Sequence, residues 1–351
     1  MSHLSRRVFL RWLAASLGTA AGGELLSACG GTPTPDRPLA APTKFAAPTK
    51  ITAPTAMAQP AATLMPSDTL VSPTTTAAPA GAPDLVVARG GEPQALVQQA
   101  LKALGGIERF VKPGNDVIVK PNMCVAYHSY EYAATTNPWV VAELVALCLG
   151  AGAGRVRVMD YPFGGSADEA YQRSGIKEQV EAAGGSMEVM SRVKYVNTDL
   201  PDGLDLHQCY IYDDILKADV VINVPIAKHH SLARLTLGMK NLMGTIRDRE
   251  LMHANLGQRL TDLAVRVRPA LTVVDAVRIL MNNGPTGGNL DDVKKLDTLI
   301  ASADIVAADS YAATLFDLKP DDLAYIRAGV ASGLGRSDLS NMKIEEIRVG
   351  G

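Results

Sequence analysis

The chain has 351 residues, of which 47% are hydrophobic and 20% charged, and its formal net charge is −2 at pH 7. Residues 84–351 hold 28 Lys and Arg against 33 Asp and Glu and contain no basic run, which argues against DNA or RNA as a partner. That segment is long enough for one large domain or for two intimately packed lobes.

The first 29 residues resemble an export signal followed by a lipid-attachment site. Arg6 and Arg7 precede a short apolar stretch, as in a twin-arginine signal, and a small-residue turn precedes Cys29, as in a bacterial lipoprotein box. A transmembrane anchor is the alternative, but Glu24 and several glycines interrupt the run of about 20 apolar residues that a span needs. We expect a signal peptide over residues 1–28, passage through the twin-arginine export machinery, and a Cys29 lipid that anchors the protein on the outer face of the cytoplasmic membrane.

The next segment, residues 29–83, has the composition of a tether. Residues 30–83 hold eleven of the 21 prolines of the chain among Thr and Ala, with few charges and few large apolar residues. Such a segment cannot bury enough apolar surface to offset the entropy of ordering. We expect a disordered linker that joins the lipidated Cys29 to a folded domain over residues 84–351.

From residue 84 onward, short β-branched runs alternate with helical patterns. This alternation predicts an α/β fold with a mostly parallel, Rossmann-like sheet flanked by helices. Strands are expected over residues 85–88, 116–120, 156–159, 187–190, 220–224, 271–274 and 299–301, with a last strand over 344–349 closing the sheet edge. Helices are expected over residues 94–104, 138–149, 167–183, 256–267, 305–315 and 321–331.

Polar residues recur at the carboxyl ends of these strands. Lys120 and Asn122 follow the second strand, Asp160 the third, a polar segment over 225–230 the fifth, and Asp275 the sixth. Ligands bind at this edge in open parallel sheets. An Asp after a strand also caps helices, and Lys-Pro-Asn is turn chemistry, so each position has a structural alternative. The clustering of all four favours a shared site.

Residues 225–244 hold the densest group of polar side chains in an otherwise apolar stretch. An unpaired buried ammonium is unfavourable, so Lys228 and Lys240 are candidates for holding a carboxylate or a phosphate. The alternative is that both extend their amines to solvent. His229 and His230 are adjacent, and in an extended segment only one of them can face a given site.

Two further patterns bear on cofactors. The loop over 283–289 is rich in glycine, and the backbone amides of residues such as Gly284 and Gly287 could cradle an anion, although a simple turn is the alternative. Cys124, Cys148 and Cys209 are dozens of residues apart, with no C-x-x-C spacing, so no cysteine-ligated iron–sulfur cluster is expected. One disulfide among these three thiols stays open, and Cys124, which follows a strand, is the one that could be exposed or reactive.

Taken in order, several of these pieces resemble the family called domain of unknown function 362, over nearly all of residues 84–351. The matching pieces are Lys120-Pro121-Asn122, Thr135-Thr136-Asn137-Pro138, Asp160, Lys228-x-His230, Thr236 through Lys240-Asn241 to Gly244, His253, Asp275, Gly284-Pro285, and Ala301 to Asp304 with Asp309. The resemblance favours His230 over His229 as the site residue and adds Asn122, Thr136 and Asn241 to the ligand-binding candidates. It implies no assigned activity, and this chain lacks the extra cysteine motifs of redox relatives.

Three functions remain open from the sequence. The leading hypothesis is an enzyme that binds a small anionic organic ligand through Lys120, Lys228 and Lys240, with His230 and either Asp275 or Asp160 for proton transfer. The second is a non-catalytic lipoprotein that captures a metabolite or a divalent metal, with His230 and His253 as metal ligands. The third is a redox protein whose cofactor is loaded before export, which rests only on the twin-arginine pattern.

Overall fold

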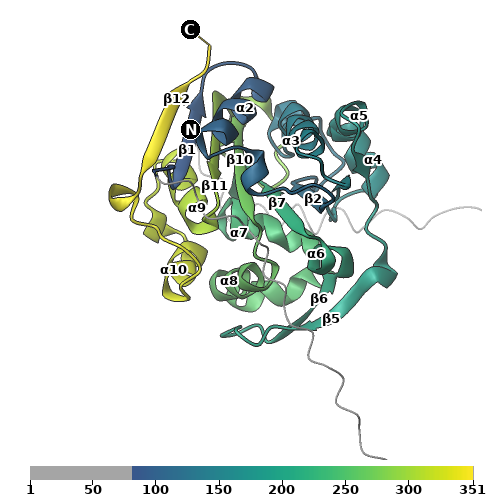
Figure 1. The fold of residues 1–351 in the computed structure, drawn as a ribbon. Helices are drawn as coiled ribbons and strands as arrows, with labels where there is room; N and C mark the ends of the chain where they lie inside the picture. Colours follow the sequence, from purple (N-terminus) through teal and green to yellow (C-terminus); the bar gives the residue numbers. More distant parts are fainter. Residues whose placement is uncertain (1–80, 351) are drawn as a thin grey trace, which may run out of the picture. The chain divides into compact units, whose positions relative to one another are not determined.

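The computed structural model describes residues 81–350, and the predicted signal peptide, Cys29 and most of the predicted tether lie outside them. The described chain forms a ten-stranded sheet and a separate two-stranded sheet. The main sheet runs in the order β12-β1-β11-β10-β7-β2-β3-β4, and β8 branches from it, pairing with β10 and β9. Figure 1 shows β10 and β7 near the middle of this sheet, with helices on both sides.

The main sheet is mostly parallel, as the sequence predicts. Neighbours from β10 through β7, β2 and β3 to β4 are parallel, whereas β11 runs antiparallel to both β1 and β10. The C-terminal strand β12 closes one edge, parallel to β1, as expected. The strands of this sheet are β1 (Leu85–Arg89), β2 (Asp116–Pro121), β3 (Arg155–Val158), β4 (Ser186–Met187), β7 (Val220–Val224), β8 (Ile226–His230), β9 (Arg234–Thr236), β10 (Leu271–Leu280), β11 (Val293–Ser302) and β12 (Ile344–Arg348).

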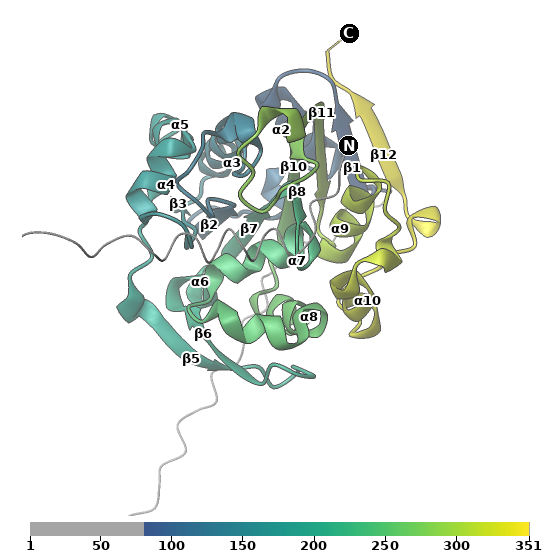
Figure 2. The same cartoon turned by 180° about the vertical axis from the view of Figure 1, so that it is seen from behind.

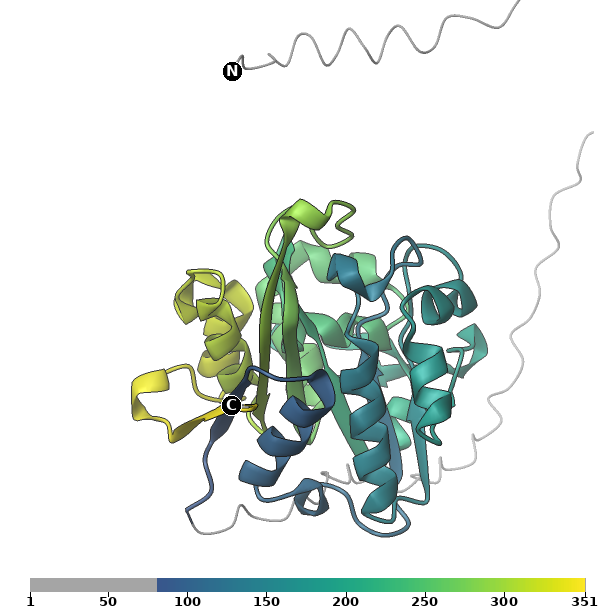
Figure 3. The same cartoon turned by 90° about the horizontal axis from the view of Figure 1, so that it is seen from above.

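Helices cover both faces of the sheet, because side chains of successive strand residues point to opposite faces. Val86 and Ala88 join one apolar cluster with α2 to α5, whereas Leu85 and Val87 join a second cluster with α7 to α10. Figure 2 shows the second set of helices, and Figure 3 shows β12 and the α4–α5 segment at opposite sides. The helices are α2 (Pro93–Ala103), α3 (Pro138–Gly150), α4 (Ala167–Arg173), α5 (Ile176–Ala182), α6 (Asp213–Lys217), α7 (Gly238–Asn241), α8 (Leu256–Val267), α9 (Ile305–Thr314) and α10 (Ala324–Ala331).

Several element boundaries differ from the sequence-based expectation. The single helix expected over 167–183 is two helices, because Gly175 adopts a φ of 75°, which ends one helix and starts the next. The strand expected over 187–190 is shorter and ends at Met187. Strands β5 (Tyr195–Asp199) and β6 (Gln208–Tyr212) form the two-stranded sheet and were not expected, since their pairing with each other is only apparent in three dimensions.

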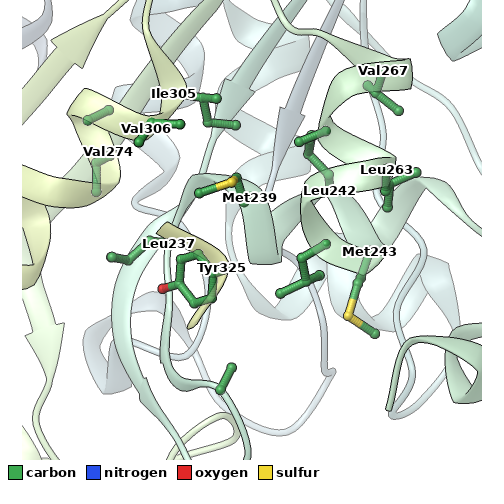
Figure 4. Close-up of a cluster of buried hydrophobic side chains, with 14 of the residues drawn as sticks. Leu237, Met239, Leu242, Met243, Leu263, Val267, Val274, Ile305, Val306 and Tyr325 are labelled. Carbon is green, nitrogen blue, oxygen red and sulfur yellow. The ribbon is translucent and has the colours of Figure 1, made fainter. Parts of the chain in front are cut away.

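The carboxyl edge of the parallel strands is where the chain is least regular. After β7 ends, Pro225 separates it from β8, whose residues Ile226 and Lys228 pair with β10 before the chain turns back into β9. The short helix α7 follows, and its apolar side chains insert into the second cluster. Figure 4 shows Met239 of α7 and Leu242, the residue that follows α7, among Leu263, Val306 and Tyr325. This apolar anchoring fixes the polar residues that α7 carries.

None of the helices within residues 81–350 combines the length and the apolarity of a membrane span.

Candidate functional site

The centre of the candidate site is a buried ion pair between the ends of two neighbouring strands. Lys120 at the end of β2 donates from Nζ to Oδ1 of Asp160 at 2.7 Å, and both side chains are almost wholly buried. Asp160 also accepts from the backbone amides of Met123 and Tyr161. A Cβ at Gly244 would lie 1.8 Å from Asp160 Oδ1, so only glycine fits beside this pair.

Two asparagines extend the ion pair into a continuous hydrogen-bonded network. Asn241 Oδ1 accepts from Lys120 Nζ at 3.2 Å and from Asn122 Nδ2 at 2.9 Å, and Asn241 Nδ2 donates to Asn223 Oδ1 at 2.9 Å. Asn122 Oδ1 in turn accepts from Lys228 Nζ at 3.1 Å. The network therefore joins β2, β7, β8 and α7, which are far apart in sequence.

Lys228 lies at the other end of this network and is fully buried. Besides Asn122, its ammonium donates to the carbonyl oxygens of Ala134 and Pro285, at 2.5 and 2.9 Å, and lies 3.2 Å from Cys124 Sγ. A buried lysine with this many acceptors has its donors used inside the protein. Lys228 therefore holds the loop over 283–289 against the loop that follows β2.

Lys240 completes what we call the lysine cluster, defined as Lys120, Lys228 and Lys240. It is half-buried on α7, next to Asn241, and it donates no hydrogen bond to any residue that the structure describes. Its pKa is lowered to about 8 by burial and then by the positive charges of Lys228 and Arg249. Lys240 is thus the member of the cluster that is free to meet a ligand.

A buried carboxylate on α9 holds the backbone of α7. Asp309 accepts from the amides of Gly238 at 2.6 Å and of Met239 at 3.0 Å, and burial raises its pKa to about 7. A Cβ at Gly238 would lie 2.7 Å from Asp309 Oδ1, so this close approach also requires glycine. Asp309 positions the turn that carries Lys240 without touching the lysine itself.

The two adjacent histidines of β8 have different surroundings, as the extended segment requires. His230 Nδ1 accepts from the amides of Leu232 and Ala233, while His229 Nδ1 accepts from the amide of Gly284. Burial, and then the charges of Lys240 and Lys228, lower the pKa of His230 to about 3. His230 is therefore neutral at physiological pH, with Nδ1 used as an acceptor and the proton on Nε2.

Asp275 and Thr136, by contrast, make contacts that shape the backbone. The two carboxylate oxygens of Asp275 accept from the amides of Asn137 and Val277, and burial raises its pKa to about 6. Thr136 Oγ1 accepts from the Asn122 amide and donates to the Val224 carbonyl. Within the described residues, no hydrogen bond or ion pair joins Asp275 to the lysine cluster, so proton transfer by Asp275 stays a prediction.

The remaining predicted positions are His253, which lies at the surface, and Gly284 and Gly287, whose backbone amides donate hydrogen bonds within the protein. His253 is exposed, and its charge acts on the pKa of His230, but the described residues include no group of three or more His, Cys, Asp or Glu side chains that could hold a metal ion. The amide of Gly284 donates to His229 and that of Gly287 to the Asn283 carbonyl. Neither amide is directed at an open anion site.

The charges at this edge do not balance. Lys120, Lys228, Lys240 and Arg249 act on one another electrostatically, and the carboxylate in contact with them is that of Asp160. Arg249 donates to the carbonyls of Met243 and Tyr161 and lies over the Tyr161 ring. Among residues 81–350 the site therefore carries an excess of positive charge with one ion pair, an arrangement that suits an anionic group.

Some residues of the site were not among the sequence-based candidates. Arg249 and Asn223 give no local signal, because each becomes part of the site only through tertiary contacts. Thr236 pairs across the β8–β9 ladder with Lys228, so the two side chains share a face, and its buried hydroxyl has no hydrogen-bond partner among the described residues. Cys124, the thiol that the sequence suggested could be exposed or reactive, is buried instead and lies beside Lys228.

Two surface cavities of about 250 and 270 Å³ lie elsewhere. The first is lined by residues that include Trp139 and Arg278, and the second by residues that include Arg268 and Asp304. Neither is lined by the lysine cluster.

Comparison with known proteins identifies relatives. The chain is 29% identical over 249 residues to a thylakoid-associated protein of Synechocystis sp., covering 68% of this chain and 75% of that protein. The lactate racemase apoprotein from Thermoanaerobacterium thermosaccharolyticum has a TM-score of 0.39 and 12% identity, covering 61% of this chain and 53% of that one. A Thermotoga maritima crystal structure has a TM-score of 0.35 and 11% identity, covering 65% and 60%.

The chain thus spans between half and two thirds of the length of these two solved structures. A family model provides the more specific match. It covers residues 117–314, a segment that contains the whole lysine cluster together with Asp160, His230 and Asp309. The chain therefore belongs to the family described as a domain of unknown function, DUF362.

Proposed function

We propose that this protein binds a small anionic organic ligand at the carboxyl edge of its sheet, with Lys240 as the group that contacts the anion. The observation that carries the proposal is the unpartnered ammonium of Lys240, among the described residues, in a cationic surrounding. Lys120 and Lys228 are saturated by acceptors of the protein, so they supply positive charge and rigidity rather than direct contacts.

The charge arrangement also supports a choice of ligand class. A cation would meet three lysines and Arg249 against the single carboxylate of Asp160, and it would be repelled. A carboxylate or a phosphate would neutralise the excess charge and provide Lys240 with the partner that it lacks within the described chain. This is the reason to prefer an anion over the divalent metal that His230 and His253 were considered to bind.

The test is binding of simple anions to the full chain. Lactate, oxalate and phosphate should each be titrated by calorimetry and by thermal shift against the wild type, Lys240→Met and Lys294→Met. Lys294 is an exposed lysine on β11 and serves as the matched control. Binding of at least one anion that is lost in Lys240→Met and kept in Lys294→Met supports the proposal. No binding, or equal binding by both variants, contradicts it.

An enzyme and a non-catalytic binding protein are distinguished by His230. Because its pKa is lowered to about 3, its imidazole is neutral at pH 7, with Nδ1 accepting from two amides and Nε2–H able to donate a hydrogen bond to a bound anion. His230→Gln should leave anion binding in place. If a reaction of the bound molecule is found, this variant should slow turnover with little change in binding, whereas a protein that only binds has no such turnover to lose.

We further propose that the protein is exported and anchored by a lipid on Cys29. The supporting observations are the paired arginines Arg6 and Arg7, the small residues before Cys29 and the thylakoid association stated in the name of the Synechocystis relative. Cys29→Ala should move the protein from the membrane fraction to the soluble exported fraction, and it should abolish labelling by an alkyne fatty acid. Lysines in place of both arginines should keep the protein in the cytoplasm. Unchanged fractionation of Cys29→Ala would refute the anchor.

A further inference from the structure

The three lysines of the cluster differ in how their ammonium groups are used. Lys120 Nζ has three acceptors, namely the Pro121 carbonyl, Asp160 and Asn241. Lys228 has three oxygen acceptors and the Cys124 sulfur. An ammonium has three donors, so neither of these two groups has a donor to spare. Lys240 has no acceptor among the described residues.

In its surroundings Lys240 loses its proton more easily than an ordinary surface lysine does. Every strong charge that lowers its basicity is a cation, namely Lys228, Arg249 and Lys120, and these add to the effect of burial. The opposing contribution comes from Cys124. A desolvated lysine next to other cations is the arrangement that makes an amine nucleophilic at neutral pH.

The position of Lys240 is also fixed rather than mobile. It lies on α7, whose backbone amides at Gly238 and Met239 are held by Asp309 and whose apolar side chains insert into the core, as Figure 4 shows for Met239. The following residue, Asn241, is tied to Lys120 and Asn223. The backbone that carries Lys240 is therefore held in place beside the charges of Lys120 and Lys228, which limits where the amine can lie.

We propose that Lys240 is a nucleophilic amine that forms an imine with the carbonyl group of an oxo acid. The proposal rests on the anion binding proposed above and names both the ligand class and the reacting atom. Once Lys240 has lost its proton, Lys228 and Arg249 still provide the positive charge that attracts the carboxylate of such a molecule. An oxo acid therefore suits the site with both of its functional groups. Its carboxylate meets the positive charges of Lys228 and Arg249, and its carbonyl carbon meets the Lys240 amine.

The reaction balances without an oxidant or a reductant. The lone pair of Lys240 Nζ forms a bond to the carbonyl carbon, and one nitrogen proton passes to the carbonyl oxygen to give a carbinolamine. The carbon–oxygen bond then breaks, the hydroxyl leaves with the second nitrogen proton as water, and the C=N bond forms. Solvent water carries these protons, and Nε2–H of the neutral His230 imidazole is available to donate a hydrogen bond to the carbonyl oxygen.

Reductive trapping tests the proposal on the full chain. Pyruvate and sodium cyanoborohydride should convert the imine into a stable carboxyethyl amine, which peptide mass spectrometry locates. At pH 7 a lysine with a pKa near 8 holds roughly 200 to 300 times more neutral amine than an ordinary surface lysine, so labelling of Lys240 should be at least about tenfold faster than that of Lys294. Labelling of Lys240 should rise as the pH increases to about 8 and then level off.

Two controls separate this inference from anion binding itself. Lactate has the carboxylate but no carbonyl group, so it should compete with pyruvate without being trapped. Lys240→Arg keeps the charge and should still bind lactate while losing the fast labelling. If lactate binds but Lys240 labels no faster than Lys294, the imine is refuted and the binding site stands. If lactate does not bind and Lys240 is not labelled, both proposals fail.

Discussion

Gly244→Ala should destabilise the protein by breaking the buried pair of Lys120 and Asp160. The new methyl group would lie 1.8 Å from Asp160 Oδ1 and 2.7 Å from Lys120 Nζ, so the carboxylate must move away from the ammonium. Gly244 has no positive φ, so the backbone itself accepts alanine. Separating the partners of a buried ion pair costs about 3 to 5 kcal/mol, a large part of the roughly 5 to 15 kcal/mol that holds a typical domain folded.

Thermal and denaturant unfolding of the variant measure this effect. For a domain of this size, about 3 to 5 kcal/mol corresponds to a fall in Tm of roughly 6 to 20 °C. Gly150→Ala is the matched control, because Gly150 lies in α3 and a Cβ there meets no atom within 4 Å. The control should be neutral or slightly stabilising, by up to about 1 kcal/mol. A Gly244→Ala protein as stable as Gly150→Ala would show that the Lys120–Asp160 pair does not constrain this position.

Three further outcomes follow from the titratable groups. The pKa of Lys240 is lowered to about 8 from 10.5, so its charged form destabilises the folded state below about pH 8. Lys240→Met should therefore raise the unfolding free energy at pH 7 by roughly 1 to 3 kcal/mol, a range that allows for the partial exposure of the side chain. The gain should shrink towards pH 10 in urea titrations, and a gain that is the same at both pH values would contradict this assignment. Burial raises the pKa of Asp309 from 3.8 to about 7, so the folded state holds its proton more tightly and loses stability as the pH rises between these values. Asp309→Asn should reduce this loss of unfolding free energy between pH 4 and 7 by up to roughly 4 kcal/mol. An unchanged slope of unfolding free energy against pH would show that Asp309 does not bind its proton in this range. Burial raises the pKa of the Cys148 and Cys209 thiols to about 12, whereas Cys124 lies beside the Lys228 ammonium. Iodoacetamide at pH 8 should modify Cys124 first in the native protein, as read by peptide mapping, and earlier modification of Cys148 would contradict this order.

Much of the fold could be predicted from local patterns. Strands β1, β2, β7 and β12 and helices α3 and α8 lie within a few residues of their expected ranges. Strands β1, β2 and β7 and helix α3 are mainly apolar runs, and α8 is an amphipathic repeat, so their patterns are complete within each element. Strands β8 and β9 could not be predicted in this way. Their residues read as a polar loop after β7, and they become strands only by pairing with β10 and with each other.

The candidate site likewise has residues whose contacts the sequence predicts and residues whose contacts it does not. The position of Lys120 and Asp160 after adjacent parallel strands predicts that they lie close together, and the structure places them 2.7 Å apart. Asp275 was expected at a strand end as well, but β10 continues past it to Leu280, and its carboxylate accepts from the amides of Asn137 and Val277. The strand-end pattern cannot distinguish these cases, because it fixes the edge of the sheet and not the direction of the side chain.

The sequence by itself determined the kind of sheet, the edge at which polar side chains gather and the family to which the chain belongs, because these depend on residue order and local periodicity. Only the tertiary structure decided how the lysines differ. Lys120, Lys228 and Lys240 all read as candidate anion ligands, yet among the described residues the first two are saturated by acceptors from distant segments and the third is not. Hydrogen-bond saturation depends on which groups from elsewhere in the chain meet a side chain, and that is set by folding.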